Sequence, residues 1–182
     1  MKICVVIPIY NECEAVGFVI DSVRRKGLDV VVVNDGSSDS SGAVAQEHGA
    51  VVLNNTCKTG KGASLRRGFE YALAHGYEGV ICMDGDGQHD AEDMEKIIRT
   101  AQNHPLSVVT GSRMSSVKDM PFIRLATNRV MSWMISCACR RKIPDTQCGY
   151  RYISSEILRH ISLESNGYEI ETEVLMKACS LG

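Results

Sequence analysis

The residues of this sequence that are best suited to do chemistry lie in the stretch 81–90, which reads ICMDGDGQHD. Asp84, Asp86 and Asp90 follow directly on an apolar run, at the end of what the pattern predicts to be a buried strand. Carboxylates crowded in this way repel one another and lose hydration, so they persist mainly where a positive charge neutralises them. A hard divalent cation such as Mg²⁺ or Mn²⁺ is the natural partner, because such ions prefer oxygen ligands.

Three interpretations of these acids stay open once a fourth is excluded. A calcium EF-hand loop needs Asp or Asn at its fifth position and Gly at its sixth, where this sequence has Gln88 and His89. In a haloacid-dehalogenase-like phosphohydrolase, Asp84 would be a nucleophile beside a magnesium ion. In the DxD motif of nucleotide-sugar glycosyltransferases, the first acid approaches the nucleoside and the second holds a divalent ion against the diphosphate. The third interpretation is structural, with the acids capping the helix that follows, although one carboxylate suffices for a cap.

Two further polar loops contain candidate residues. In NDGSSDSS, residues 34–41, Gly36 permits a tight turn, and Asp35 stands where a buried strand ends. A carboxylate there needs hydrogen-bond donors, which nucleoside hydroxyls or base N–H groups would supply. The loop CKTGKG, residues 57–62, departs from the phosphate-loop pattern. Lys61 is therefore interpreted either as a phosphate contact at a helix start or as a solvated lysine.

Alternating strands and helices must position these loops. Apolar runs predict strands at 2–10, 29–34, 50–54, 79–84 and 107–111, and helical periodicity lies between and after them, up to a last helix at 169–180. Strands without polar alternation are typical of sheets covered on both faces. The predicted fold class is therefore α/β, an open, Rossmann-like, mostly parallel sheet with helices on both faces. In such a sheet the loops after the first, second and fourth strands converge on one edge.

Composition narrows the class of protein further. The 182 residues carry a formal net charge of -2, which argues against a nucleic-acid partner, because such proteins usually present a strongly basic face. Eight cysteines occur without CxxC spacing, which favours a reducing compartment over a disulfide framework or a zinc site. We find neither a secretory signal nor a membrane span, so a single domain over 1–182 with a cytoplasmic location is expected.

The long helical stretch at 122–139 allows two interpretations. Trp133, several methionines and the basic end Arg140-Arg141-Lys142 would suit a membrane interface. Its apolar positions 123, 126, 130, 134 and 137 would equally suit packing on the sheet, which is the usual fate of an amphipathic face and the interpretation favoured here.

Taken in order, six segments resemble the family 2 glycosyltransferases of GT-A fold, and within them the dolichol- or polyprenyl-phosphate sugar synthases. The segments are VVIPIYNE, VVNDGSSD, GKGASLRRGFEYA, MDGDGQHD, VVTGSRM and DTQCGYR, which together span nearly the whole chain. Each segment alone is weak, whereas six in the right order are specific.

The resemblance implies a role for each matching residue. Pro8, Tyr10, Glu12, Val33 and Asp35 would form the nucleoside pocket. Asp84 and Gly85 would contact the ribose and diphosphate, and Asp86 and Gln88 would ligate the metal. Arg113 would meet phosphate oxygens, with Arg124 as a second donor. The segment DTQCGYR would be the acceptor loop, with Asp145 as the candidate general base.

The implied reaction is an inverting transfer from a nucleoside-diphosphate sugar of the GDP-mannose or UDP-glucose type to an acceptor, which the resemblance suggests is polyprenyl or dolichyl phosphate. Metal and arginines would stabilise the negative leaving group, with Asp86 holding the metal. A phosphate acceptor is already anionic, so Arg151 would then matter more than a base at Asp145. Because family members typically continue beyond the equivalent of Gly182, a catalytically incomplete nucleotide-sugar-binding domain is the alternative, and a peripheral membrane contact is a further expectation.

Overall fold

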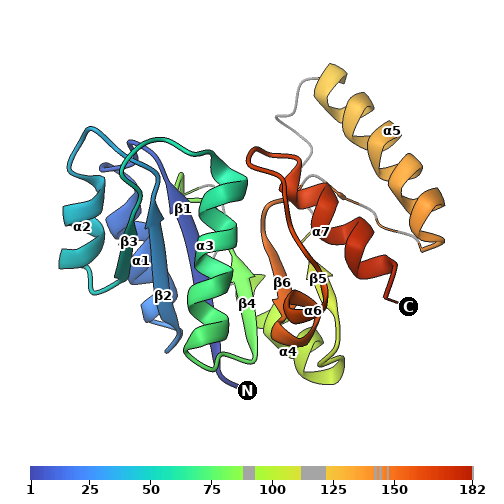
Figure 1. Ribbon diagram of the computed structural model, residues 1–182, viewed down its shortest axis with the longest axis horizontal. Coiled ribbons are helices and arrows are strands. Elements are labelled where there is room, and N and C mark those ends of the chain that lie inside the picture. Colours follow the sequence, from blue (N-terminus) through green and yellow to red (C-terminus); the bar gives the residue numbers. More distant parts are fainter. Residues whose placement is uncertain (88–92, 112–121, 142, 144, 147, 182) are drawn as a thin grey trace.

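The computed structural model describes residues 1–87, 93–111, 122–141, 143, 145–146 and 148–181, and leaves the side chains of 122–126 and 138 undescribed. Its centre is a six-stranded sheet in the order β3-β2-β1-β4-β6-β5 (Figure 1). The strands are β1 (Ile3–Ile9), β2 (Asp29–Asn34), β3 (Val51–Asn54), β4 (Gly79–Cys82), β5 (Val108–Thr110) and β6 (Arg151–Ser154). The first four are mutually parallel, whereas β6 runs antiparallel to both β4 and β5. The expected open, mostly parallel sheet is confirmed.

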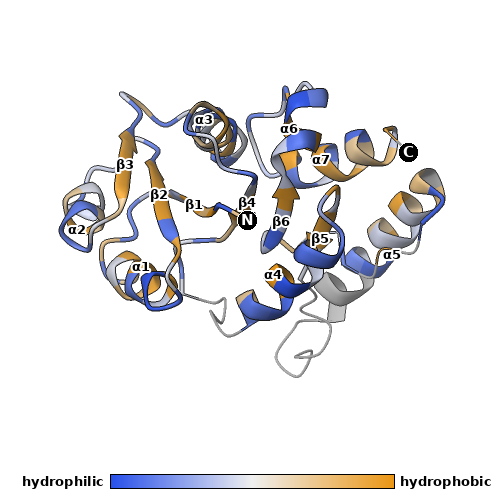
Figure 2. Ribbon diagram, turned by 90° about the horizontal axis from the view of Figure 1, so that it is seen from below, coloured by the Kyte–Doolittle hydropathy of each residue, from blue (hydrophilic) through white to orange (hydrophobic). Residues whose placement is uncertain are grey.

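Helices cover both faces of the sheet (Figure 2). The covering helices are α1 (Val16–Arg24), α2 (Ser41–Glu47), α3 (Lys61–Ala74), α4 (Asp93–Asn103), α6 (Ser155–His160) and α7 (Ile170–Cys179), and a further helix, α5 (Phe122–Cys139), contacts α7. Apolar residues of α1, α2 and α4 form one core with alternate residues of β1, such as Val5 and Ile7. Those of α3, α6 and α7 form a second core with the intervening residues Cys4 and Val6. The period-2 alternation of a strand thus divides one apolar run between two cores.

Strand β6, residues 151–154, was not predicted from the sequence, which placed an acceptor loop at 145–151. Its four residues pair with β4, so that Arg151 lies opposite Cys82 at the carboxyl end of that strand. All four residues of β6 are buried. The reversed direction places the start of β6, and the residues leading into it, at the same edge as the carboxyl ends of the parallel strands.

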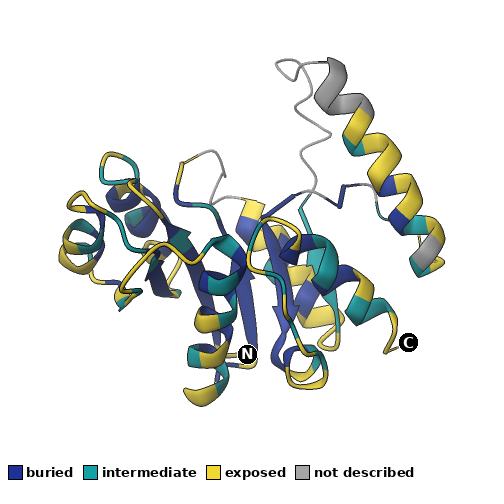
Figure 3. Cartoon of the chain, turned by 45° about the horizontal axis from the view of Figure 1, so that its top comes forward, coloured by how far each residue is buried: buried dark blue, intermediate teal, exposed yellow. Residues whose placement is uncertain are grey.

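Helix α5 corrects the packing interpretation as well. Val130, Trp133 and Met134 are exposed by 56%, 68% and 54%, and Cys137 is exposed too. The helix stands beside α7, away from the sheet, and its outward residues are mostly exposed (Figure 3). Positions 123 and 126 belong to the undescribed side chains. The described part of the helix therefore presents its apolar stripe outward.

Polar side chains on the inward side of α5 accept hydrogen bonds from the backbone of residues 143 and 146. The Ser132 hydroxyl accepts from the Thr146 N–H at 3.1 Å, and Ser136 accepts from the Ile143 N–H at 2.9 Å. These contacts satisfy backbone groups that burial would otherwise leave without partners. Two small polar residues, Ser132 and Ser136, therefore face the body of the protein together with the buried Ile135. Among the described residues, we find no helix long and apolar enough to cross a membrane.

Candidate functional site

A cavity of about 380 Å³ opens where the carboxyl ends of β1, β2 and β4 meet the start of α3. It lies at the edge where open α/β sheets usually bind ligands, and its size suits a small molecule. Its walls are Pro8, Ile9, Tyr10, Glu12, Asp35, Lys58, Gly60, Lys61, Ser64, Asp84, Gly85, Asp86, Gly167 and Tyr168. The expected convergence of three polar loops is therefore found.

The predicted site residues divide into three groups. Pro8, Tyr10, Glu12, Asp35, Asp84, Gly85 and Asp86 line the cavity. Val33 and Asp145 do not line it, and the side chain of Val33 is fully buried in the core beneath α3. Gln88 and Arg113 lie outside the described residues, and Arg124 lies in α5 with its side chain undescribed.

Asp35 has its donors within the chain. Its carboxylate accepts hydrogen bonds from the Asn55 side chain at 2.8 Å, from the Thr59 N–H and hydroxyl at 2.9 and 2.6 Å, and from the Gly60 N–H at 2.8 Å. Burial alone would raise the pKa of Asp35, but these hydrogen bonds outweigh burial and lower the pKa to about 2. The inference that Asp35 needs an external donor is therefore wrong, and its carboxylate organises the loop 55–60.

Gly36 explains why this turn fits against that loop. Its φ of +71° lies in the left-handed region, and a Cβ there would stand 2.7 Å from the backbone carbon of Cys57. The close approach brings Lys58 and Gly60 to the cavity wall.

The acids at the mouth of the cavity influence one another. The pKa of Glu12 is raised, first by burial and then by the negative charges of Asp86, Asp39 and Asp84. A bound divalent cation would relieve this repulsion, and carboxylate oxygens are suitable ligands for Mg²⁺ or Mn²⁺. Within the described ranges, no three His, Cys, Asp or Glu side chains form a metal-binding group. The charge of Glu12, Asp84 and Asp86 thus fits a cation, whereas the predicted ligand Gln88 is not described.

Lys61 is neither solvated nor beside free helix N–H groups. Its ammonium lies 2.6 Å from an oxygen of Asp84 and 2.7 Å from an oxygen of Glu171, and its side chain is only 15% exposed. The Asn166 carbonyl accepts from the N–H groups of Gly62 and Ala63 at 2.7 and 3.3 Å. That carbonyl occupies the amino end of α3, so the proposed anion site at this helix is closed.

Residues 148–151 lie close to the acidic loop, residues 84–86: a Cβ at Gly149 would stand 3.0 Å from a carboxylate oxygen of Asp84. Arg151 is 2% exposed, and its guanidinium donates to the carbonyls of Cys148, Thr146 and Glu171. It is a buried structural residue, and it does not line the cavity.

Asp145 is also buried, at 1% exposure, and it does not line the cavity. Its carboxylate accepts a 3.2 Å hydrogen bond from the Asn128 side chain of α5. The candidate base Asp145 therefore lies where α5 contacts the residues that precede β6.

Two aromatic–lysine pairs flank the cavity. The Lys58 ammonium lies 3.6 Å above the Tyr10 ring, and that of Lys61 lies 5.4 Å from the Tyr168 ring. Lys58, Tyr168 and the ion-pair partner Glu171 were not predicted from the sequence. Tyr168 and Glu171 lie more than 80 residues from the acidic loop along the chain, so local spacing carries no signal for them. Lys58 does lie in the glycine-rich segment that the sequence singled out.

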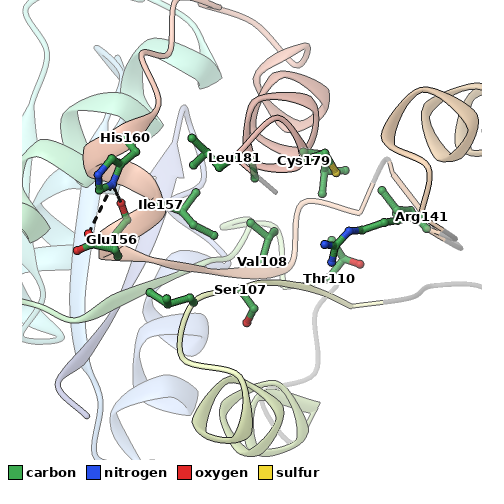
Figure 4. A pocket seen from close by; sticks show the side chains of 13 residues that line it. Ser107, Val108, Thr110, Arg141, Glu156, Ile157, His160, Cys179 and Leu181 are labelled. Atoms are coloured by element: carbon green, nitrogen blue, oxygen red, sulfur yellow. Dashed lines mark hydrogen bonds and ion pairs between the residues drawn. The ribbon is translucent and has the colours of Figure 1, made fainter.

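A second, larger cavity of about 580 Å³ lies elsewhere, beside the edge strand β5 (Figure 4). Its walls are mostly apolar and come from β5, α6 and α7, with Arg141 towards one end and the Glu156–His160 ion pair towards the other. It contains none of the predicted site residues.

Comparison with known proteins connects this arrangement to one family. Residues 4–162 match the model of glycosyl transferase family 2. The undecaprenyl-phosphate mannosyltransferase of Micrococcus luteus is 31% identical over 100% of this chain and 79% of its own length. The polyprenol monophosphomannose synthase of Mycolicibacterium smegmatis is 30% identical over 98% of this chain and 72% of its own length.

The fold is found in solved structures as well. Glucosyl-3-phosphoglycerate synthase from Mycobacterium tuberculosis, crystallised with Mn²⁺, uridine diphosphate and phosphoglyceric acid, superposes with a TM-score of 0.74 at 21% identity. The match covers 96% of this chain and 62% of that one, so this chain spans under two thirds of the solved protein. The fold is the expected GT-A fold, and the chain belongs to glycosyl transferase family 2.

Proposed function

We propose that this protein transfers a sugar from a nucleoside-diphosphate sugar to a polyprenyl phosphate, with inversion at the anomeric carbon. The observation that carries the proposal is the cavity that collects Pro8, Tyr10, Glu12 and the Asp84–Asp86 loop at one sheet edge. The two curated relatives described above are named for a polyprenyl-type acceptor and for mannose. We extend both features to this chain, and regard GDP-mannose and UDP-glucose as the donors to test first.

The cavity residues suit a nucleoside diphosphate. The Tyr10 ring is 40% exposed, and the Lys58 ammonium lies 3.6 Å above it. We propose that the ring stacks on the base and that Lys58 turns to a phosphate of the same ligand. Gly85 lies against β1, where a Cβ would stand 2.8 Å from the Ile9 side chain, so the loop passes close to the strand ends. The Asp84 and Asp86 backbones are thereby held at the cavity wall.

A divalent ion, Mg²⁺ or Mn²⁺, would neutralise the diphosphate as it leaves. Asp86 and Gln88 are the residues we propose to hold it. Arg113 and Arg124 are proposed as further partners for phosphate oxygens. The exposed position of Asp86 at the cavity leaves its carboxylate accessible to an ion that arrives with the donor.

The acceptor sets the role of Asp145. A polyprenyl phosphate carries no proton that must leave before attack, so it needs positioning rather than a base. The hydrogen bond from Asn128 to the buried Asp145 carboxylate gives this residue a positioning role through α5. Replacing Asp145 with Asn should then lower transfer to a phosphate acceptor without changing the pH profile. If Asp145 were a catalytic base, the variant would instead lose the alkaline plateau in the pH dependence of the transfer rate.

Helix α5 supports a peripheral contact with the membrane that carries the acceptor. Val130, Trp133, Met134 and Cys137 follow i, i+3, i+4 and i+7 spacing on its outward side, and Arg140 and Arg141 follow it. Co-sedimentation with vesicles containing anionic lipid should therefore retain the protein, and Trp133→Ser should weaken retention without lowering the melting temperature. Equal retention of both proteins would contradict the contact.

One experiment tests the function directly. Isothermal titration with UDP, GDP and their sugars, each with and without Mn²⁺, should give metal-dependent binding of one nucleotide. Sugar transfer to a short polyprenyl phosphate should follow with the same nucleotide specificity. Metal-dependent binding without transfer to any acceptor would instead favour the incomplete, nucleotide-sugar-binding domain. Absence of binding to every nucleotide would refute the proposal.

A further inference from the structure

Glu171 is a buried acid that the proposed reaction does not use. It lies in the first turn of α7, is 8% exposed, and is absent from the walls of the cavity. Its carboxylate nevertheless lies 2.7 Å from the ammonium of Lys61, which does line the cavity and which pairs with Asp84 at 2.6 Å. One cation thus joins α7, the start of α3 and the acidic loop after β4.

Contacts with Arg151 hold Glu171 in place. Arg151 donates to its backbone carbonyl at 2.5 Å and stands 4.0 Å from its carboxylate. Arg151 is in turn held by carbonyls of the segment before β6. Glu171 is therefore anchored by the sheet, whereas Asp84 lies in a loop beyond the end of β4. In this series of contacts, Glu171 fixes the position of Lys61, and Lys61 fixes the position of Asp84.

The charges explain why all these groups are needed together. Two carboxylates on one ammonium carry a net negative charge, and the guanidinium of Arg151 brings the four groups to neutrality. Burying such groups is tolerated only when each is paired. Gly149 packs directly against this cluster, since a Cβ there would stand 2.9 to 3.1 Å from side-chain atoms of Glu171, Asp84 and Lys61. The space between these three side chains is therefore set by the backbone of the segment that leads into β6.

We propose that Glu171 is a positioning residue for the donor site, acting through Lys61 to fix the Asp84 carboxylate at the cavity wall. The inference rests on the proposed function, since it takes the cavity to bind a nucleoside diphosphate. Without Glu171, Lys61 has one carboxylate partner fewer, and its four-carbon chain is free to adopt other rotamers. Asp84 then loses its fixed orientation, although every residue of the cavity wall is unchanged.

The test is a double-mutant cycle with the unaltered protein, Glu171→Gln, Lys61→Met and the double variant, measured by titration with UDP and GDP in the presence of Mn²⁺. Removing a hydrogen-bonding partner of a metal ligand typically costs about 10- to 100-fold in metal affinity or activity, and we take the same range for a partner that supports Asp84 through Lys61. We expect such a loss for Glu171→Gln, and we expect the double variant to bind as weakly as Lys61→Met alone. Donor KM should rise more than kcat falls. Multiplicative losses would show that Glu171 acts independently of Lys61 and would overturn the proposal.

Two controls separate folding from positioning. Glu171→Asp keeps a negative charge beside Arg151 but shortens the side chain, so it should fold and still lose affinity; affinity equal to that of the unaltered protein would overturn the proposal. Glu156→Gln removes an acid that is 50% exposed on α6, and its affinity should not change. If the unaltered protein binds no nucleotide at all, the proposed function fails, an outcome distinct from normal binding by Glu171→Gln.

Discussion

Replacing Asp35 with Asn tests the hydrogen-bonded turn beneath the cavity. The pKa of this carboxyl is lowered from its ordinary value of 3.8 to about 2, because hydrogen bonds from Thr59, Asn55 and Gly60 outweigh the opposing effect of burial. The difference of nearly two pH units corresponds to about 2.5 kcal/mol of folding free energy. At 4% exposure the group is little screened by water.

The sign of this contribution follows from linkage. A lowered pKa in the folded state stabilises the protein at pH above the ordinary value, and the stabilisation is lost as the pH falls from about 4 to about 2. In Asp35→Asn, an amide NH₂ group also faces N–H donors of the turn, which adds an unmade hydrogen bond. At pH 7 we therefore expect a loss of at least about 2.5 kcal/mol, or a melting temperature lower by about 5 to 10 °C for a chain of this size.

Urea denaturation of both proteins from pH 7 down to pH 2 measures the prediction. The difference in free energy of unfolding between them should shrink as the pH falls below 4. Glu70→Gln, which alters an exposed acid of α3, should change stability by less than about 0.5 kcal/mol at any pH. A constant difference between the Asp35 variant and the unaltered protein at all pH values would show that the carboxylate charge is not what stabilises the turn.

Three further predictions concern the same region and the thiols. Gly149→Ala should lower the free energy of unfolding by about 1 to 3 kcal/mol in a urea titration, because a methyl group would stand within 3.1 Å of three charged side chains; an unchanged midpoint would contradict this. Asp86→Asn should abolish the Mn²⁺ dependence of nucleotide binding in calorimetry, yet leave the melting temperature equal or higher, because it removes a negative charge near Glu12; retained metal dependence would refute the assignment. In native labelling at pH 8, Cys57 should react with a maleimide at once, whereas Cys82, whose burial raises its pKa to about 12, should react only on unfolding, as mass spectrometry of the labelled peptides will show.

Much of the fold could be predicted from local pattern. A strand that is covered on both faces of the sheet has a continuous apolar sequence, so β1, β2 and β4 could be predicted from such runs. The carboxyl ends of parallel strands meet at one edge whatever the details of packing, which is why the acidic loop and Tyr10 were expected together and are found together.

The rest depended on contacts between distant segments. Strand β6 is four residues long and pairs with β4, about 70 positions earlier in the chain, so periodicity does not reveal it. The sequence left Lys61 as either a phosphate contact or a solvated lysine, because its partners Asp84 and Glu171 lie 23 and 110 positions away. Helix α5 shows the same limit, since an apolar stripe does not indicate whether its partner is the protein's own core.

The reversed direction of β6 separates the residues that line the cavity from those that support its wall. The loops after the parallel strands β1, β2 and β4 line the cavity, whereas the beginning of the antiparallel strand β6 lies at the same edge of the sheet without lining it. A substitution just before β6, such as one at Gly149, would therefore reach the cavity through Glu171, Lys61 and Asp84, while the sequence of the βα loops that line the cavity stays unchanged.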